Sequence, residues 1–335
     1  MVFTTIGNNV PGNIEVDEER TLVSDVIVGS CLMLISFACA VAYSFVLAAI
    51  WRDDELMKMP TYRFMFVLGI FDVLPCIPHF ITGIFTICQS VFHPILAEVS
   101  DFYALFQHSR LIKHSISVFG TPCYVAYCVI TVILSINRFL FVVSPKYNEA
   151  LFSAPVLHVW YVIIVLFWFV FALLLASPWA SLVYSPQDYS WTYDFNLPLS
   201  SVVQKSAMGL ELGCIVIFGF FYLCTLIVLY LTRKRFTASS KSRAELKILI
   251  QCIVIAAYCA VMNTLWHQSQ MFPSNLWCKM VLNFMWVVNS AVYPTIYFIV
   301  NRRVHEEVIG EAWITSKLEI PELFAVVLYP RTKRF

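Results

Sequence analysis

The sequence carries very little charge. Only 13% of its 335 residues are Asp, Glu, Lys or Arg, whereas 60% are hydrophobic. A soluble domain of this length needs far more charge to cover its surface, so a soluble globular protein is excluded. The composition instead indicates a protein that crosses a membrane several times, and we predict an all-α membrane fold.

Several sequence signatures are also absent. The eleven cysteines never form a C-x-x-C pair, which argues against a zinc or redox motif. His93, His108 and His114 have no ligand-like spacing, so no metal site is predicted. Residues 1–25 are acidic and polar and do not look like a secretory signal peptide. We therefore expect membrane insertion to begin at the first apolar span.

Seven apolar stretches are long enough to cross the hydrocarbon core of a bilayer, which takes about 20 residues. We predict a seven-transmembrane helix bundle over residues 26–301, with an N-terminal segment at 1–25 and a tail at 302–335. The spans are expected at about 26–51, 64–91, 114–143, 156–184, 206–232, 246–272 and 276–300. Of the 22 Lys and Arg residues, 17 lie in segments on the side of the C-terminus. The positive-inside rule thus predicts an extracellular N-terminus and a cytoplasmic tail.

The third span carries a polar stripe. From His114 to Asn137 it contains no charged residue, yet polar side chains recur at steps of three and four, a spacing that places them on one helix face. The stripe consists of Ser117, Thr121, Tyr124, Cys128, Thr131, Ser135 and Arg138. Such a face should turn toward other helices and away from lipid. We therefore expect this span at the centre of the bundle.

Arg138 ends the third span within the tetrapeptide INRF. One interpretation is an Arg whose long side chain reaches the membrane interface. The other is a switch, in which the cation is held between helices in one state and released to a partner in another. The polar stripe that leads to Arg138 favours the switch. In the seventh span, Pro294 lies between Tyr293 and Tyr297 and predicts a kink that can act as a hinge.

Asp72 and Glu211 are the only acids well inside the predicted spans. An ionised, unpaired carboxylate there costs about 2.5 kcal/mol or more, so each should face the bundle or be protonated. For Asp72, the expected hydrogen-bond partners are Asn289, Ser290 and Tyr293, and its role is either a polar clamp between helices or an ion or proton site. Glu211 either reaches water or lines a ligand cavity.

An outward-opening cavity is the other candidate site. Aromatic walls with a few polar groups are typical of small-ligand sites, and several side chains near the outer ends of four spans fit this description. The predicted lining residues are Ser117, Thr121, Tyr124, Glu211, Asn263, His267, Gln270 and Trp286. Routine hydrogen bonding between helices is the alternative role for each of them.

These features resemble G-protein-coupled receptors, and more closely the nematode chemoreceptors called serpentine receptors, class T. The passages YRFMFVLGIFDVLPCIPHFITGIFTI, CYVAYCVITVILSINRFLFVVSP and SAVYPTIYFIVNRRV look like the second, third and seventh spans of that family. The resemblance covers about residues 30–305. It implies a chemosensory receptor that binds a small-molecule or pheromone-like ligand among spans three, five, six and seven. It also implies signalling to a heterotrimeric G protein through the inner end of span three.

The resemblance also assigns residues. Arg138 takes the place of the Arg in the Asp-Arg-Tyr motif of rhodopsin-like receptors, with Asn137 for the Asp and Phe139 for the Tyr. Tyr293, Pro294 and Tyr297 align with the motif Asn-Pro-x-x-Tyr, in which Tyr293 replaces the Asn. We interpret these six residues as the G-protein coupling switch. Because Asn137 is neutral, it cannot form the usual ion pair with the Arg, and the resting restraint must differ.

The loop between spans four and five contains no Cys, so the disulfide that usually joins this loop to the third span cannot form. Cys123, near the start of the third span, is then unpaired or has another partner. Cys88 and Cys278, both near the predicted outer face, are the alternatives.

We expect a multi-pass protein of the plasma membrane, surrounded by lipid bilayer, with a sensory cilium as one candidate location. No enzymatic activity, cofactor or nucleic-acid partner is expected. The alternative function is a transporter or channel with Asp72 as coupling residue, which the absence of internal repeats disfavours. An intramembrane hydrolase would need a second Asp at the depth of Asp72 or a Ser-His pair within reach, and the sequence offers neither a second Asp at that depth nor a well-placed His. A retinal photoreceptor would need a mid-span Lys, and Lys279 lies about two turns too early.

Overall fold

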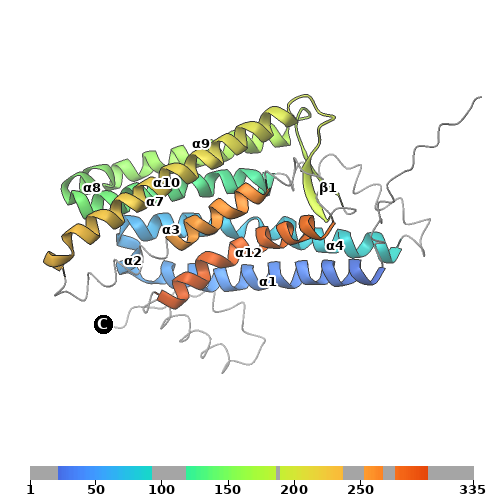
Figure 1. Cartoon of the computed structure of the whole chain (residues 1–335), viewed down its shortest axis with the longest axis horizontal. Helices are drawn as coiled ribbons and strands as arrows, with labels where there is room; N and C mark the ends of the chain where they lie inside the picture. Colours follow the sequence, from blue (N-terminus) through green and yellow to red (C-terminus); the bar gives the residue numbers. More distant parts are fainter. Residues whose placement is uncertain (1–21, 93–117, 186–188, 237–252, 267–275, 301–335) are drawn as a thin grey trace, which may run out of the picture.

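The computed structural model describes residues 22–92, 118–185, 189–236, 253–266 and 276–300. Long helices run side by side, and a two-stranded hairpin covers one end of the bundle (Figure 1). Five of the described helical segments are long and apolar enough to cross a membrane, and two shorter apolar helices accompany them. We name the two ends of the bundle the hairpin end and the α8 end, after the elements found there.

The elements follow one another in the order of the predicted spans. They are α1 (Leu22–Arg52), α2 (Asp54–Lys58), α3 (Pro60–Val73), α4 (Cys76–Phe92), α7 (Thr121–Val143), α8 (Pro145–Leu151), α9 (Ala154–Ala176), β1 (Leu182–Ser185), β2 (Ser190–Tyr193), α10 (Ser200–Phe236), the helix Ile253–Trp266, and α12 (Leu276–Val300). Strands β1 and β2 pair antiparallel, with Leu182 opposite Tyr193.

Prolines mark several helix boundaries, because proline lacks the backbone N–H that a helix interior needs but fits the first turn. Pro75 lies in the gap between α3 and α4, which together correspond to the predicted second span. Pro145 begins α8, and Ser144 alone separates it from the last residue of α7. Pro155 lies in the first turn of α9, and Pro60 begins α3.

The fourth span differs from the prediction. The sequence predicts a helix over 156–184, but α9 ends at Ala176 and residues Leu182–Ser185 form strand β1. The cause is Pro178, since the residue before a proline is pushed toward extended conformations. Ser177 accordingly has φ −77° and ψ 160°. The chain then turns back over the bundle as a hairpin.

Other helices also differ in length from the predicted spans. Helix α10 begins at Ser200, ahead of the expected residue 206, and its 37 residues correspond to about 55 Å. Residues 114–117 of the third span and all of 246–272 except 253–266 lie outside the described residues. The segments 1–21 and 301–335, which include the predicted tail, also lie outside them.

The centre of the bundle is α7. It contacts α3, α9 and α10, and every residue from Pro122 to Thr131 is buried. Within the predicted polar stripe, Tyr124, Cys128, Thr131 and Ser135 are buried, as expected. The hydroxyls of Thr131 and Ser135 donate to carbonyls of the same helix, those of Tyr127 and Val132, at 2.9 and 2.7 Å. This satisfies the hydroxyls inside an apolar core.

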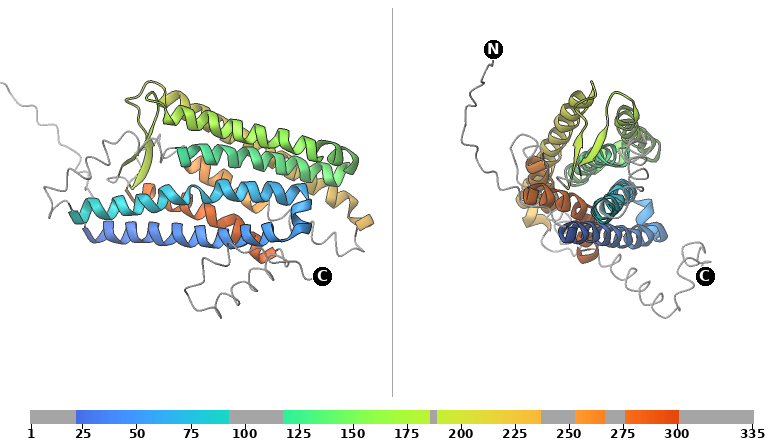
Figure 2. Two further views of the ribbon diagram at one scale, coloured as in Figure 1. Left: turned by 180° about the vertical axis from the view of Figure 1, so that it is seen from behind. Right: turned by 90° about the vertical axis from the view of Figure 1, so that its right-hand side faces the viewer.

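Helices α9 and α10 expose many apolar side chains on their outer faces. Val162 and Leu173 of α9 are exposed, as are Val216 and Leu223 of α10. Exposed apolar side chains on the long apolar spans Ala154–Ala176 and Ser200–Leu231 fit contact with lipid acyl chains. The two helices thus form part of the wall of the bundle (Figure 2).

Helices α1 and α4 approach each other at two glycines. A Cβ atom added to Gly29 would lie 2.7 Å from the carbonyl oxygen of Gly83, and one added to Gly83 would lie 2.5 Å from that of Gly29. No larger residue fits at either position without moving backbone, and small residues at such crossings let membrane helices pack closely. This contact fixes α4, which carries the hairpin, against α1.

Candidate functional site

The α8 end of α7 is held by neutral hydrogen bonds. The Thr61 hydroxyl of α3 donates to the Oδ1 atom of Asn137 at 2.7 Å, and Asn137 Nδ2 donates to Oδ1 of Asn148 in α8 at 2.9 Å. Asn137 is only 2% exposed, so its amide joins three helices inside the protein. The amide of Asn137 therefore provides neutral hydrogen bonds at this end of α7.

The other predicted switch residues belong to two helices, α7 and α12. Arg138 is half-buried, and the ring of Phe139 packs against Phe221 of α10 with centroids 5.5 Å apart. Pro294 is buried within α12, which continues as a helix on both sides of it. Tyr293 and Tyr297 belong to α12, but their side chains lie outside the described part of the structure.

The hairpin is attached to the helices by aromatic side chains. The Tyr184 hydroxyl lies 2.7 Å from Thr86 Oγ1, and Trp191 Nε1 donates to Thr82 Oγ1 at 3.0 Å. Both threonines belong to α4 and are fully buried. Hydrogen bonds from buried phenol and indole groups combine apolar packing with directional contacts. They fix the hairpin to α4 without a covalent link.

The turn of the hairpin reaches α1. Tyr189 adopts φ 49°, in the left-handed region that non-glycine residues rarely occupy. Its ring is 2% exposed and packs among Val28, Leu32 and Val287, while its hydroxyl donates to the carboxylate of Asp25. This burial and this hydrogen bond compensate the backbone strain. The hairpin is thereby connected to α1 as well as to α4.

A cavity lies beneath the hairpin, and the space between its walls, including the solvent at its open side, measures about 930 Å³. Its walls come from α3, α4, α7, α10, α12, the helix Ile253–Trp266 and both strands. The lining residues are Phe71, Asp72, Pro75, Pro78, His79, Gly120, Thr121, Tyr124, Tyr127, Leu182, Trp191, Tyr193, Glu211, Trp266, Asn283, Trp286, Asn289 and Ser290. This composition, mostly aromatic and apolar with a few polar groups, is typical of small-ligand sites.

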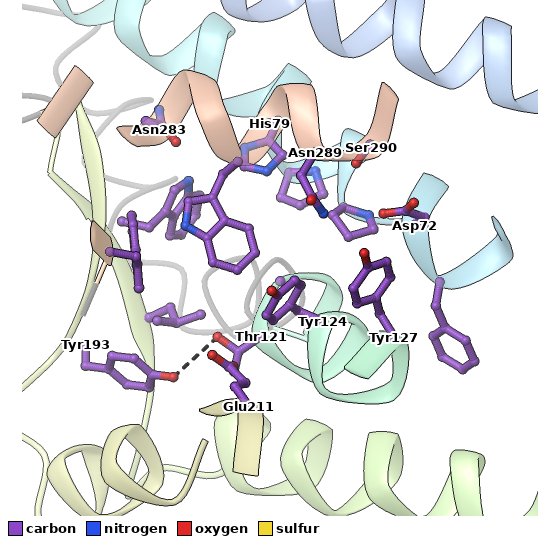
Figure 3. Close-up of a pocket in the computed structure, with 18 residues that line it drawn as sticks. Asp72, His79, Thr121, Tyr124, Tyr127, Tyr193, Glu211, Asn283, Asn289 and Ser290 are labelled. Atoms are coloured by element: carbon purple, nitrogen blue, oxygen red, sulfur yellow. Dashed lines mark hydrogen bonds between the residues drawn. The ribbon is translucent and has the colours of Figure 1, made fainter. Parts of the chain in front are cut away.

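Hydrogen bonds tie two walls of the cavity together. The Thr121 hydroxyl lies 3.3 Å from that of Tyr193 (Figure 3). Asn263 Nδ2 donates to the Tyr124 hydroxyl at 3.0 Å. Burial raises the pKa of the Tyr193 phenol above its ordinary value, and the Glu211 charge raises it further, against the opposing effect of the Thr121 hydrogen bond. Tyr193 therefore stays neutral and retains its proton for hydrogen bonding.

Four polar atoms in the lining have no hydrogen-bond partner among the described residues. They are Asp72 Oδ2, His79 Nδ1, Trp286 Nε1 and Asn289 Oδ1, and each is buried. Buried polar groups are nearly always satisfied, by protein, by water or by a ligand. These atoms therefore mark the cavity as a place where a polar molecule can bind.

The structure brings the two predicted clusters into one cavity. Thr121, Tyr124, Glu211 and Trp286 line it, and so do Asp72, Asn289 and Ser290, which the sequence suggests as a separate polar network. Figure 3 shows Asp72, Asn289 and Ser290 on one side and Tyr193 and Glu211 on another. Asn263 does not line the cavity but donates a hydrogen bond to the hydroxyl of Tyr124, which does. Ser117, His267 and Gln270 lie outside the described residues.

Several lining residues were not predicted from the sequence. Asn283 precedes Trp286 by three residues on α12, so the spacing that indicates Trp286 could also have indicated Asn283. His79 follows Asp72 by seven residues, but Pro75 and Pro78 interrupt the helical pattern between them. The hairpin residues, such as Tyr193, reach the cavity only through tertiary folding.

Cys123 is fully buried at the start of α7 and forms no disulfide with any described cysteine. This includes Cys88 and Cys278, the two alternatives that the sequence suggests. The hairpin is therefore attached by hydrogen bonds in place of a disulfide.

Comparison with known proteins agrees with this architecture. The family described as serpentine type 7TM GPCR chemoreceptor Srt matches residues 11–318, which confirms the resemblance found in the sequence. No curated protein gives a match. The crystal structure of squid rhodopsin matches with a TM-score of 0.67 and 13% identity, over 93% of this chain and 93% of that chain. At this identity the likeness shows the fold alone. The chain thus has the seven-transmembrane fold of rhodopsin, and it belongs to the Srt family of serpentine chemoreceptors.

Proposed function

We propose that the protein is a chemosensory G-protein-coupled receptor of the plasma membrane. A small external ligand binds in the cavity under the hairpin, and a heterotrimeric G protein binds at the α8 end beside Arg138. The hairpin end and the N-terminus face the outside, and the tail is cytoplasmic. The observation that carries this proposal is the arrangement along α7, whose one end lines the cavity and whose other end bears Arg138.

Helix α10 offers a physical connection between the two ends. Glu211 of this helix lines the cavity, and ten residues further along it Phe221 packs against Phe139, next to Arg138. A ligand can shift an equilibrium only if it binds one state more tightly than the other. A ligand that draws Glu211 inward would move α10 relative to α7 and change the packing around Phe139.

Helix α12 offers a second connection. Trp286 lines the cavity, and Pro294 follows it on the same helix by eight residues, about 12 Å. In the active state, α12 bends at Pro294, with Tyr293 and Tyr297 on either side. Both helices thus link the cavity to the proposed G-protein site, as a receptor requires. The family and the fold are those of receptors, and neither supports the alternative of a transporter with Asp72 as coupling residue.

The test is replacement of Arg138 by Ala in cells that express the full chain together with a G-protein reporter. We expect Arg138→Ala to abolish G-protein activation, both basal and ligand-induced, while delivery to the cell surface stays normal. Lys146→Ala is the matched control, because it removes an exposed positive charge from α8 at the same end. Normal signalling by Arg138→Ala would exclude the proposed switch.

A further inference from the structure

The described lining of the cavity offers little to a charged ligand. It contains no Lys or Arg, so an anion would enter a membrane interior unpaired. Of the two acids in the lining, Glu211 already has an interaction within the protein, and Asp72 is only 3% exposed. A carboxyl group so deeply buried in a membrane is more stable as the uncharged acid than as an unpaired anion. The lining therefore suits an uncharged ligand.

Helix α12 presents one donor and one acceptor to the cavity. Trp286 Nε1 can only donate and Asn289 Oδ1 can only accept, and neither has a hydrogen-bond partner among the described residues. The two residues are three positions apart, so they share a helix face and are separated by about 4.5 Å along the helix axis. Asn289 is 4% exposed, and Figure 3 shows it on the cavity side of α12. A ligand that satisfies both atoms must offer an acceptor to the indole and a donor to the amide oxygen.

Helix α4 adds a third polar atom to the lining. His79 Nδ1 is buried and has no hydrogen-bond partner among the described residues. An imidazole nitrogen donates in one tautomer and accepts in the other, so it can meet either side of the same ligand group. These three polar partners are thus an indole, an amide and an imidazole, none of which carries a permanent charge.

Aromatic rings form the apolar part of the wall. Tyr124 meets Trp286 edge to face with centroids 4.5 Å apart and stacks on Tyr127 at 5.3 Å. Trp266 meets Trp286 at 5.6 Å from the other helix. Because these rings pack against one another, the wall is preorganised, and flat or aromatic ligand groups pack well against it.

We propose that the ligand is a small uncharged molecule with an aromatic body and an amide-like group, whose carbonyl oxygen accepts from Trp286 Nε1 and whose N–H donates to Asn289 Oδ1. A primary amide carries its acceptor and its donor on separate atoms, which suits two partners nearly one helical turn apart. The inference rests on the proposed function, because it names the chemical class of the ligand in that same cavity. It assigns Trp286 and Asn289 as the residues that determine specificity.

The test measures thermal stabilisation of the purified full chain in micelles by four probes that differ only in the group at the end of a phenylmethyl body. Phenylacetamide carries the amide. Phenylacetone replaces the NH₂ group by a methyl group and keeps the carbonyl. At neutral pH, phenylacetate carries a negative charge and phenethylamine a positive one. A ligand that binds the folded protein raises its unfolding temperature in proportion to its affinity and concentration.

We expect phenylacetamide to bind most tightly and phenylacetone about tenfold more weakly, because the ketone leaves Asn289 Oδ1 without a donor. Phenylacetate and phenethylamine should not stabilise the protein at the same concentrations. Equal binding of phenylacetone and phenylacetamide would overturn the proposal. So would tighter binding of either charged probe, or no binding of phenylacetamide.

Two substitutions separate the donor from the acceptor. Trp286→Phe keeps an aromatic ring but removes the indole N–H, so we expect it to weaken phenylacetamide and phenylacetone alike, each about tenfold. Asn289→Leu keeps the approximate volume but removes the acceptor, so phenylacetamide should fall to the affinity of phenylacetone, which should itself stay unchanged. If both variants retain the preference for the amide at full strength, the assignment of these two residues is wrong.

Trp277→Phe is the matched control for the indole. Trp277 lies on the same helix but is exposed and does not line the cavity, so this variant should bind all four probes like the unmodified protein. Where Asn289→Leu folds poorly, the ratio of phenylacetamide to phenylacetone affinity in Trp286→Phe still tests the pair. That ratio should stay at about ten, because the donor to Asn289 is unaffected.

Binding and signalling are measured separately, so the two proposals can fail separately. If phenylacetamide stabilises the protein but the G-protein reporter stays silent, the ligand class stands and the proposed receptor function falls. If a charged compound activates the reporter and phenylacetamide does not bind, the receptor function stands and the ligand class is wrong.

Discussion

The two ends of α7 are restrained in chemically similar but structurally different ways. At the α8 end, the amide of Asn137 bonds to Thr61 and Asn148 at 2.7 and 2.9 Å. At the hairpin end, Thr121 and Tyr124 bond to Tyr193 and Asn263 at 3.3 and 3.0 Å. All of these hydrogen bonds join neutral groups. The resemblance to rhodopsin-like receptors associates one end with an ion pair and the other with a disulfide, and the sequence, with Asn137 and a loop without Cys, allows neither in its usual form.

The difference lies in what surrounds each set of bonds. Asn137 is buried between helices, away from the cavity, so only a movement of the helices can break its hydrogen bonds. Thr121, Tyr124 and Tyr193 line the cavity, so a ligand can compete directly for their hydroxyls. Neutral hydrogen bonds contribute about 1 kcal/mol each, which is small enough for a ligand to offset. Under the proposed function, a ligand would act directly on the hydrogen bonds of the hairpin end, whereas those of the α8 end would change only when the helices move.

The largest effect is expected from Gly83, where α4, the helix to which the hairpin is hydrogen-bonded, packs closely against α1. Gly83→Ala would place a Cβ atom 2.5 Å from both the Gly29 carbonyl oxygen and the Met33 side chain. Helix α4 must then move away from α1, and its Thr82 and Thr86 carry the hydrogen bonds to the hairpin. We expect a loss of about 3 kcal/mol in the free energy of unfolding, measured by denaturation in micelles.

Gly219→Ala in α10 is the control for this substitution. Nothing lies within 4 Å of a Cβ atom at Gly219, and the change improves helix propensity. This variant should be as stable as the unmodified protein or slightly more so. If Gly83→Ala were equally well tolerated, the close contact between α1 and α4 would not be what supports the hairpin.

The next effect is expected at the α8 end. Asn137→Ala removes both hydrogen bonds of the amide, so we expect a loss of about 2 kcal/mol in the free energy of unfolding. Because these bonds join α7 to α3 and α8, their loss should also raise G-protein activation in the absence of ligand. The measurements are denaturation of the purified protein and basal signalling in cells.

Ser135→Ala is the matched variant for Asn137→Ala. Its hydroxyl is equally buried but bonds only to the carbonyl of Val132 in the same helix. We expect this variant to leave basal signalling unchanged. Equal basal signalling by Asn137→Ala and Ser135→Ala would show that the amide does not restrain the resting state.

Helical residues of the site could be predicted from the sequence, because a helix converts spacing along the chain into position on a face. Thr121 and Tyr124 share a stripe on α7, and Trp286 and Asn289 share one on α12, so their inward orientation follows from periodicity alone. The acid Glu211 could be identified because burying a carboxylate among apolar residues is costly. These residues line the cavity.

The hairpin residues could not be predicted in this way. The segment 177–199 has no helical period, and several of its side chains contact residues more than sixty positions away, as Tyr193 contacts Thr121. The prediction even placed Leu182 and Tyr184 in the fourth span, because they continue an apolar run. Pro178 was the signal that this run could not remain helical. The pairing of Tyr184 with Thr86 and of Trp191 with Thr82 depends on the tertiary fold and could not be read from the sequence.

The smallest effect is expected from the Tyr193 hydroxyl, and it is visible mainly as a dependence on pH. Burial raises the pKa of this phenol in the folded protein, whereas in the unfolded chain it is about 10. Above about pH 10 the unfolded chain therefore binds fewer protons at this position than the folded protein. The contribution of this phenol to the free energy of unfolding is therefore complete below about pH 10 and is lost as the pH rises further. Tyr193→Phe should make this alkaline decline less steep and cost less than about 1 kcal/mol at neutral pH.

Denaturation from neutral pH to about pH 11 tests this prediction, since it covers the range in which an unperturbed phenol ionises. Tyr147→Phe, at an exposed tyrosine of α8, is the control from the opposite end of the bundle and should not change the slope. An alkaline decline as steep in Tyr193→Phe as in the unmodified protein would mean that the phenol at the hairpin end is open to solvent. Its hydrogen bond to Thr121 would then not be part of a closed cavity wall, and the contrast between the two ends of α7 would be lost.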